Sequence, residues 1–137
     1  MAIVLSGCVT TPTVDDAAKA QQQFQSATVL MQQNKHAEAK TALLALQPFR
    51  TKDPRVLASL AAASDMTGDF RTADRAYTML SESSFDRVTL WNNWGYSQML
   101  RGNYQKAAFY LFEAQRLAPN NEAVANNIGM LKKVTVL

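Results

Sequence analysis

The chain is poor in the residues on which most catalytic and metal sites depend. Its 137 residues include one cysteine, Cys8, and one histidine, His36. A lone cysteine excludes an intrachain disulfide and any multi-cysteine metal site. No nucleophile or carboxylate has a spacing that would pair with His36 as a general base, and Glu38 points to another side of the same expected helix. Asp15-Asp16 is interpreted as a favourable helix start rather than a metal site.

Motifs of cofactor chemistry are missing as well. The sequence has no phosphate-cradling glycine loop, no metal-ligand spacing and no nucleophile elbow. Asp65 and Asp69 flank an expected turn, where we expect both to be solvated. We therefore expect a protein that is not an enzyme and that carries no cofactor and no metal.

Neither charge nor hydrophobicity is concentrated in one stretch. The formal charge is +3, but the basic residues are scattered and only Lys132-Lys133 are adjacent. A nucleic-acid-binding protein usually gathers its positive charge on one face, so no nucleic-acid partner is expected. No run of about 20 apolar residues follows the N-terminus, so no membrane-spanning helix is expected. The length and an apolar content of 47% suit one globular domain.

The residues that end at Cys8 point to a lipid anchor. Leu5-Ser6-Gly7-Cys8 resembles the lipobox of bacterial lipoproteins, in which a signal peptide is cut before a cysteine whose thiol is then acylated. Residues 1–14 would be the signal remnant and a polar tether. Val9, directly after the cysteine, is similar to the class that stays at the outer membrane. The resemblance implies lipidation of Cys8, such as by palmitate, and a location in the cell envelope, on the outer membrane facing the periplasm.

Two interpretations of this segment stay open. Only Met1 to Val4 precede the box, whereas a signal peptide has a basic stretch followed by an apolar run of about 7 to 15 residues. The lipoprotein interpretation therefore requires a misassigned start or a truncated chain. The alternative is a disordered apolar N-terminus in which the cysteine is incidental.

After the tether, the chain repeats with a period of 34 residues. Small residues, turn residues, aromatic rings and large residues each recur at this spacing, and such self-similarity is the signature of a helical repeat array. The columns are Ala27, Ala61, Gly95 and Gly129; Ala39, Ala73 and Ala107; Asn34, Gly68 and Gly102; His36, Phe70 and Tyr104; and Leu43, Tyr77 and Leu111.

This pattern resembles the tetratricopeptide repeat (TPR) family. The best match runs from Trp91-Asn-Asn-Trp-Gly95 through Gly102-Asn-Tyr104 to Pro119. The resemblance implies an all-α solenoid of three helix hairpins plus a terminal helix. The TPR domain would cover residues 15–137, with repeats at about 20–53, 54–87 and 88–121 and a terminal helix at 122–133. The small columns would let the two helices of each hairpin approach closely, and stacked hairpins would share one core.

Local signals predict the helix ends. Asp53-Pro54 supplies an N-cap and a proline at the first helical position, and Gly68-Asp69 and Gly102-Asn103 each join a left-handed glycine to a new cap. Asn120-Asn121 would cap the last helix. The predicted helices are 15–33, 36–47, 54–67, 70–82, 88–101, 104–117 and 122–133.

In the TPR family the first helix of each hairpin lines a concave groove. The resemblance implies a protein partner, a peptide or a helix, bound in this groove, and methionines there would adapt to varied apolar side chains. The same residues could instead be ordinary packing, with Met99 in the core. The implied groove residues are Gln21, Phe24, Thr28, Met31, Arg55, Ala58, Ala62, Asp65, Thr89, Asn92, Tyr96, Met99, Asn126, Met130 and Lys133.

Three functions from different classes remain. The lipobox joined to a short repeat array resembles the lipoproteins that assemble tight-adherence (Flp) pili and the pilotins of secretion systems. The alternative is a structural scaffold that self-associates, as a homo-oligomer, through its apolar C-terminal stretch 134–137. An enzyme acting on the cell wall is the third, and no residue supports it. The first function is expected.

Overall fold

The computed structural model describes residues 13–135, and these residues form helices and no strand. The expected all-α class is therefore confirmed for this part of the chain. The helices, in chain order, are α1 (Val14–Gln32), α2 (His36–Ala45), α3 (Pro48–Thr51), α4 (Pro54–Met66), α5 (Phe70–Ser81), α6 (Arg87–Leu100), α7 (Tyr104–Leu117) and α8 (Glu122–Thr135).

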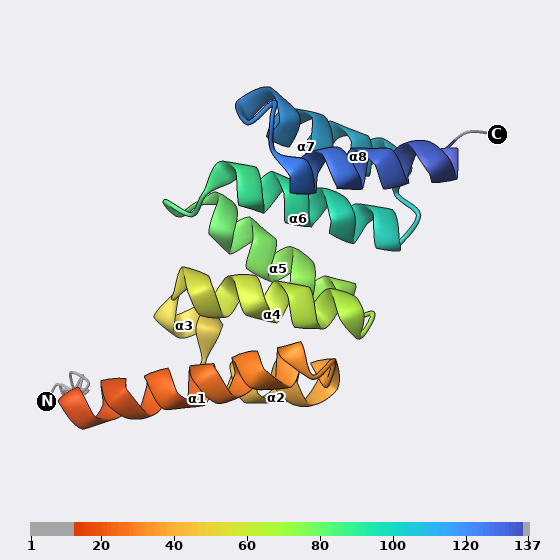
Figure 1. Ribbon diagram of the computed structural model, residues 1–137. Helices are drawn as coiled ribbons and strands as arrows, with labels where there is room; N and C mark the ends of the chain where they lie inside the picture. The colour runs from red at the N-terminus through yellow and green to blue at the C-terminus, as the bar shows by residue number, and fades with distance from the viewer. Residues whose placement is uncertain (1–12, 136–137) are drawn as a thin grey trace, which may run out of the picture.

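The long helices pack as consecutive pairs. α1 packs with α2, α4 with α5 and α6 with α7, and α8 then lies against α7. The pairs follow one another along a stack, with α1 and α2 at one end and α7 and α8 at the other (Figure 1). Across the pairs, α6 also contacts both α4 and α8.

Helix ends follow the local chemistry of the sequence. Asp53 caps α4 by accepting a hydrogen bond of 2.9 Å from the backbone N–H of Arg55, with Pro54 at the first helical position. Gly68 and Gly102 have φ of +73° and +76°, the left-handed conformation that glycine adopts without strain. The seven predicted helices begin and end within two residues of the observed ones.

Two local predictions are wrong. The second predicted helix extends to residue 47, but α2 ends at Ala45 and a separate four-residue helix, α3, follows. Pro48 begins this turn because proline fits a first helical position and cannot continue an existing helix. Asn103 was expected to cap α7; its side chain makes no capping bond and donates instead to Oε1 of Gln98 at 3.0 Å.

The small and large residues with the 34-residue period fill the core, whereas the turn residues with the same period are exposed. The alanines at 27, 39, 61, 73 and 107 have no exposed surface, and the large residues at 43, 77 and 111 are buried with them. Gly95 is also buried, because Leu111 of α7 packs directly over it. Gly129, the last member of that column, has open space where a side chain would stand. Small residues therefore permit close helix packing at every column position except the last.

Candidate protein-binding surface

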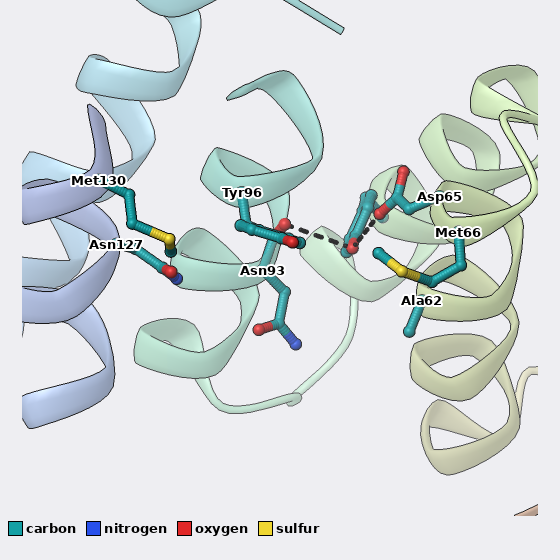
Figure 2. Close-up of a pocket in the computed structure, with 8 residues that line it drawn as sticks. Ala62, Asp65, Met66, Asn93, Tyr96, Asn127 and Met130 are labelled. Atoms are coloured by element: carbon teal, nitrogen blue, oxygen red, sulfur yellow. Dashed lines mark hydrogen bonds between the residues drawn. The ribbon is translucent and has the colours of Figure 1, made fainter. Parts of the chain in front are cut away.

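One depression of about 380 Å³ lies across α4, α6 and α8, and we call it the central depression. Figure 2 shows that its labelled side chains come from both sides and from the middle, with Asp65 and Met66 facing Asn127 and Met130 across Tyr96. Met66 and Met130 are both partly exposed. The lining residues are Ala62, Asp65, Met66, Tyr77, Asn93, Tyr96, Asn127 and Met130.

Asp65 is the buried acid of this surface. Only 6% of the residue is exposed, which corrects the expectation that it is solvated. The Tyr77 hydroxyl donates to its Oδ2 at 2.8 Å, and the Ser97 hydroxyl donates to its Oδ1 at 2.6 Å. The guanidinium of Arg101 lies 3.8 Å from Oδ1. Both carboxylate oxygens are therefore bonded by neighbouring helices, as a buried charge requires.

The same arginine links this acid to a second one. Arg101 Nη1 lies 2.8 Å from Oδ2 of Asp74, and its guanidinium also stands over the ring of Phe70, 4.4 Å from the ring centre. Trp94 donates its indole N–H to the other oxygen of Asp74 at 3.3 Å. Helices α4, α5 and α6 are thus joined behind the depression by one polar network.

Burial sets the titration behaviour of the two groups that meet in this network. Burial raises the pKa of the Asp65 carboxyl, although the hydrogen bonds from Ser97 and Tyr77 and the charge of Arg101 oppose the shift. Burial and the neighbouring Asp65 charge raise the pKa of the Tyr77 hydroxyl, which is therefore a hydrogen-bond donor and not a base. These groups stabilise the wall of the depression.

A stack of aromatic rings shares Tyr77 and Trp94 with this network. The rings of Tyr77 and Trp94 are 5.6 Å apart, those of Trp94 and Tyr110 4.7 Å, and those of Tyr110 and Trp91 5.5 Å, with each pair nearly parallel. Such stacking stabilises each pair beyond the area it buries. The tryptophans in the stretch Leu90–Tyr96 therefore hold α5, α6 and α7 together, while Tyr96 lines the depression.

Amide side chains connect α6 with α8. Asn127 donates from Nδ2 to Oδ1 of Asn92 at 2.8 Å, and Asn92 donates to Oδ1 of Asn93 at 3.4 Å. Asn93 and Asn127 line the depression, whereas Asn92, expected in the groove, is not among its lining residues and instead accepts the bond from Asn127. Amides both donate and accept, so this floor can bond the N–H and C=O groups of a protein backbone.

The residues proposed for the groove fall into several places. Ala62, Asp65, Tyr96 and Met130 line the central depression. Phe24 and Arg55, with Gln21, line another depression of about 430 Å³ near the starts of α1 and α4. There the Arg55 guanidinium donates to Oε1 of Gln21 at 3.2 Å and stands over the Phe24 ring, 5.4 Å from its centre.

The remaining predicted residues are not gathered at either depression. Met31, Ala58 and Met99 are partly buried against the hydrophobic clusters, Met99 among residues of α7 and α8. Thr28 is exposed and donates its hydroxyl to the carbonyl of Phe24 at 3.0 Å, and Asn126, Thr89 and Lys133 are exposed.

Sequence reasoning missed four residues of the central depression. Asn93 and Asn127 are 34 residues apart, so the repeat period could have identified them as equivalent residues. Met66 lies four residues after Ala62, on the same face of α4, and could have been found from that spacing. Tyr77 stands in a packing column with Leu43 and Leu111, and nothing local distinguishes its hydroxyl from their apolar ends.

Two other predicted features have different positions. Cys8, the expected lipidation site, lies outside the described residues. His36 begins α2, and its Nδ1 is buried without a hydrogen-bond partner among residues 13–135. Within that range no three histidine, cysteine, aspartate or glutamate side chains gather as metal ligands would, and none of its helices is long and apolar enough to cross a membrane. Comparison of the sequence with protein-family models and with curated proteins gives no match.

Proposed function

We propose that the protein is a protein-protein interaction module of the TPR type, without enzymatic activity. Two independent features support this proposal. The small and large residues that repeat every 34 positions are buried, apart from Gly129, and the long helices pack as consecutive pairs. In a TPR solenoid, the first helices of the pairs, here α1, α4, α6 and α8, line the binding face.

The observation that carries the proposal is the central depression on α4, α6 and α8. Its two methionines can adapt to an apolar side chain, and its amides can bond a backbone. The network of Asp65, Tyr77 and Arg101 keeps three helices in fixed positions behind it. A surface that is fixed in advance loses less conformational freedom on binding. The partner is therefore a segment of another protein, extended or helical.

The lipobox extends this proposal to a location. Acylation of Cys8 would tether the repeat domain to the outer membrane, facing the periplasm, and a second signal would strengthen the anchoring by a single chain. A small repeat domain on such an anchor suits an assembly factor of a pilus or secretion system, similar to the lipoproteins of Flp pili. The alternative is a scaffold that self-associates through the end of α8, where Val134 is half exposed.

The groove proposal is tested by a double substitution at its centre. Tyr96→Ser with Met130→Ser removes a ring and a thioether from the depression without touching the aspartate network. Capture of the partner by the purified chain should fall on the order of tenfold or more, as expected when central contacts of an interface are removed. Val29→Ser, an exposed apolar residue on α1, is the matched control and should leave capture unchanged.

If the double variant melts like the wild-type protein and still captures the partner with full affinity, the central depression is not the binding site. If the wild-type chain forms a dimer that Val134→Ser dissociates, the scaffold alternative replaces it.

A further inference from the structure

The outer face of α7 carries two phenylalanines that its own packing does not require. Phe109 is 62% exposed and Phe112 is 50% exposed. One repeat earlier, on α5, the positions 34 residues before them are Arg75 and Thr78, which are exposed and polar. The fold therefore tolerates polar residues at these positions. Two large rings in water at places where the preceding repeat has polar residues indicate a surface that something else covers.

A recess adjoins one of these rings. Between α7 and α8 lies a depression of about 300 Å³, bounded by Phe112 and Tyr104 on one side. Its floor contains Ile128 and Leu131 of α8, each only 4% exposed. A protruding side chain can reach this floor, whereas a flat surface cannot. We call the whole area the α7–α8 patch: Tyr104, Phe109, Phe112, Ile128, Leu131 and Lys132.

The charge around the patch is positive and unopposed within the described residues. Lys132 lines the recess, and Lys106 is one helical turn from Phe109. Neither lysine takes part in an ion pair within residues 13–135. The one acid of α7, Glu113, is held by Arg116 at 2.9 Å. A ligand with carboxylates beside its apolar face would gain from both lysines.

We propose that the α7–α8 patch is a second interaction surface, which binds an amphipathic helix that carries acidic residues beside its apolar face. A recess between two helices, with exposed rings at its edge, suits an apolar helix face whose side chains project into it. A bilayer suits it less, because the floor is recessed and because α1, which leads from the proposed anchor, lies at the other end of the stack (Figure 1). The patch shares no residue with the central depression.

The test uses the full chain and a defined probe. The probe is a fluorescent synthetic helix with leucines on one face and glutamates on both flanks, and its binding is followed by anisotropy. A second peptide has lysines in place of the glutamates. The acidic peptide should bind the wild-type chain more tightly, and Phe109→Ser with Phe112→Ser should weaken its binding on the order of tenfold. Lys106→Glu with Lys132→Glu should reduce the preference for the acidic peptide.

A matched control exists within the repeat. Leu44 of α2 occupies the position 68 residues before Phe112 and is 41% exposed, so Leu44→Ser changes an equivalent residue outside the patch. It should leave peptide binding and melting temperature unchanged. The double phenylalanine variant should also keep its melting temperature, because both rings are exposed, and should still capture the partner of the central depression.

Four outcomes would overturn the proposal. Equal binding of the acidic and basic peptides would show that the two lysines do not select an acidic partner. Unchanged binding by the double phenylalanine variant would show that the peptide does not bind at the α7–α8 patch. Sedimentation with anionic vesicles that is lost in the phenylalanine variant would assign the patch to a lipid surface. A wild-type dimer that becomes a monomer in the same variant would assign it to a second copy of the chain.

Discussion

The hydroxyl of Tyr77 on α5 donates a hydrogen bond of 2.8 Å to the carboxylate of Asp65 on α4, at the wall of the central depression. The two residues are 12 positions apart and belong to the two helices of one pair. This bond and that from Ser97 of α6 allow a carboxylate to be buried where three helices meet.

Tyr77→Phe should destabilise the protein by about 1 to 3 kcal/mol, because it leaves one oxygen of a buried carboxylate without its donor. The pKa of Asp65 should rise further, since the lost bond is one of those that lower it. Urea denaturation and a carbon-13 NMR titration of Asp65 measure the two effects. Tyr110→Phe is the control, because no hydrogen bond of the Tyr110 hydroxyl is found within residues 13–135. Because both variants keep the ring, an equal loss in the two would show that the hydrogen bond from Tyr77 to Asp65 does not account for the destabilisation.

Gly95 and Gly129 stand one repeat apart but should respond differently to alanine. A Cβ at Gly95 would lie 2.7 Å from Cγ of Leu111 and 3.3 Å from the carbonyl oxygen of Ala107, whereas a Cβ at Gly129 meets nothing within 4 Å. Gly95→Ala should cost about 1 to 3 kcal/mol through overpacking. Gly129→Ala should be neutral or stabilise by up to about 1 kcal/mol, because alanine favours a helix. Thermal melts measure both effects. Equal changes in melting temperature for the two variants would contradict the close packing of α7 on α6.

Asp86→Ala should weaken the start of α6 in a pH-dependent manner. Asp86 accepts a hydrogen bond of 2.7 Å from the backbone N–H of Thr89, and the bonding to Thr89 holds the pKa of its carboxyl below the ordinary value. The contribution of a lowered carboxyl pKa is full above the unfolded-state value and is lost as the pH falls through the folded-state value. The variant should lose about 1 kcal/mol at neutral pH. The difference from wild type should shrink toward zero in strong acid.

Denaturation curves at neutral and strongly acidic pH check this result. Glu82→Ala, at an exposed acid that ends α5, is the control and should show no comparable loss. A constant difference between Asp86→Ala and wild type across the pH range would show that the carboxylate does not act as a cap.

Cys8→Ser tests the proposed anchor. The variant should leave the membrane fraction and should not incorporate a radioactive fatty acid, because serine lacks the sulfur atom that is acylated. Ser6→Ala keeps a small residue in the box and should remain in the membrane fraction. Unchanged fractionation of Cys8→Ser, with no label on the wild-type chain, would contradict the proposed lipid anchor at Cys8.

The fold was more predictable from the sequence than the surface. Proline, glycine and aspartate act locally, so Pro54, Gly68 and Asp53 define helix ends without knowledge of distant contacts. The 34-residue columns likewise identify Ala61 and Ala107 as core residues, because every repeat places them against a neighbouring helix. The short helix α3 was missed since it depends on Pro48 and two left-handed residues at its ends.

The candidate site depends on contacts between elements, and these were harder to predict. Tyr96 and Met130 were found because they occupy equivalent positions on first helices. Asp65 was expected in water because it stands near a turn, yet Ser97, 32 residues away, bonds it in the interior. A local pattern shows that a residue ends a helix, but it does not show which distant donor covers that residue.

Site-specific cross-linking tests the central claim most directly. A photoreactive amino acid is placed at position 96, in the central depression, and in a separate protein at the exposed position of Arg71 on α5, in native cells. The proposed function predicts a discrete adduct with one envelope protein at position 96, its loss when Met130→Glu is added, and none at position 71. No adduct at position 96, or the same adduct at both positions, would contradict the claim that α4, α6 and α8 form a protein-binding surface.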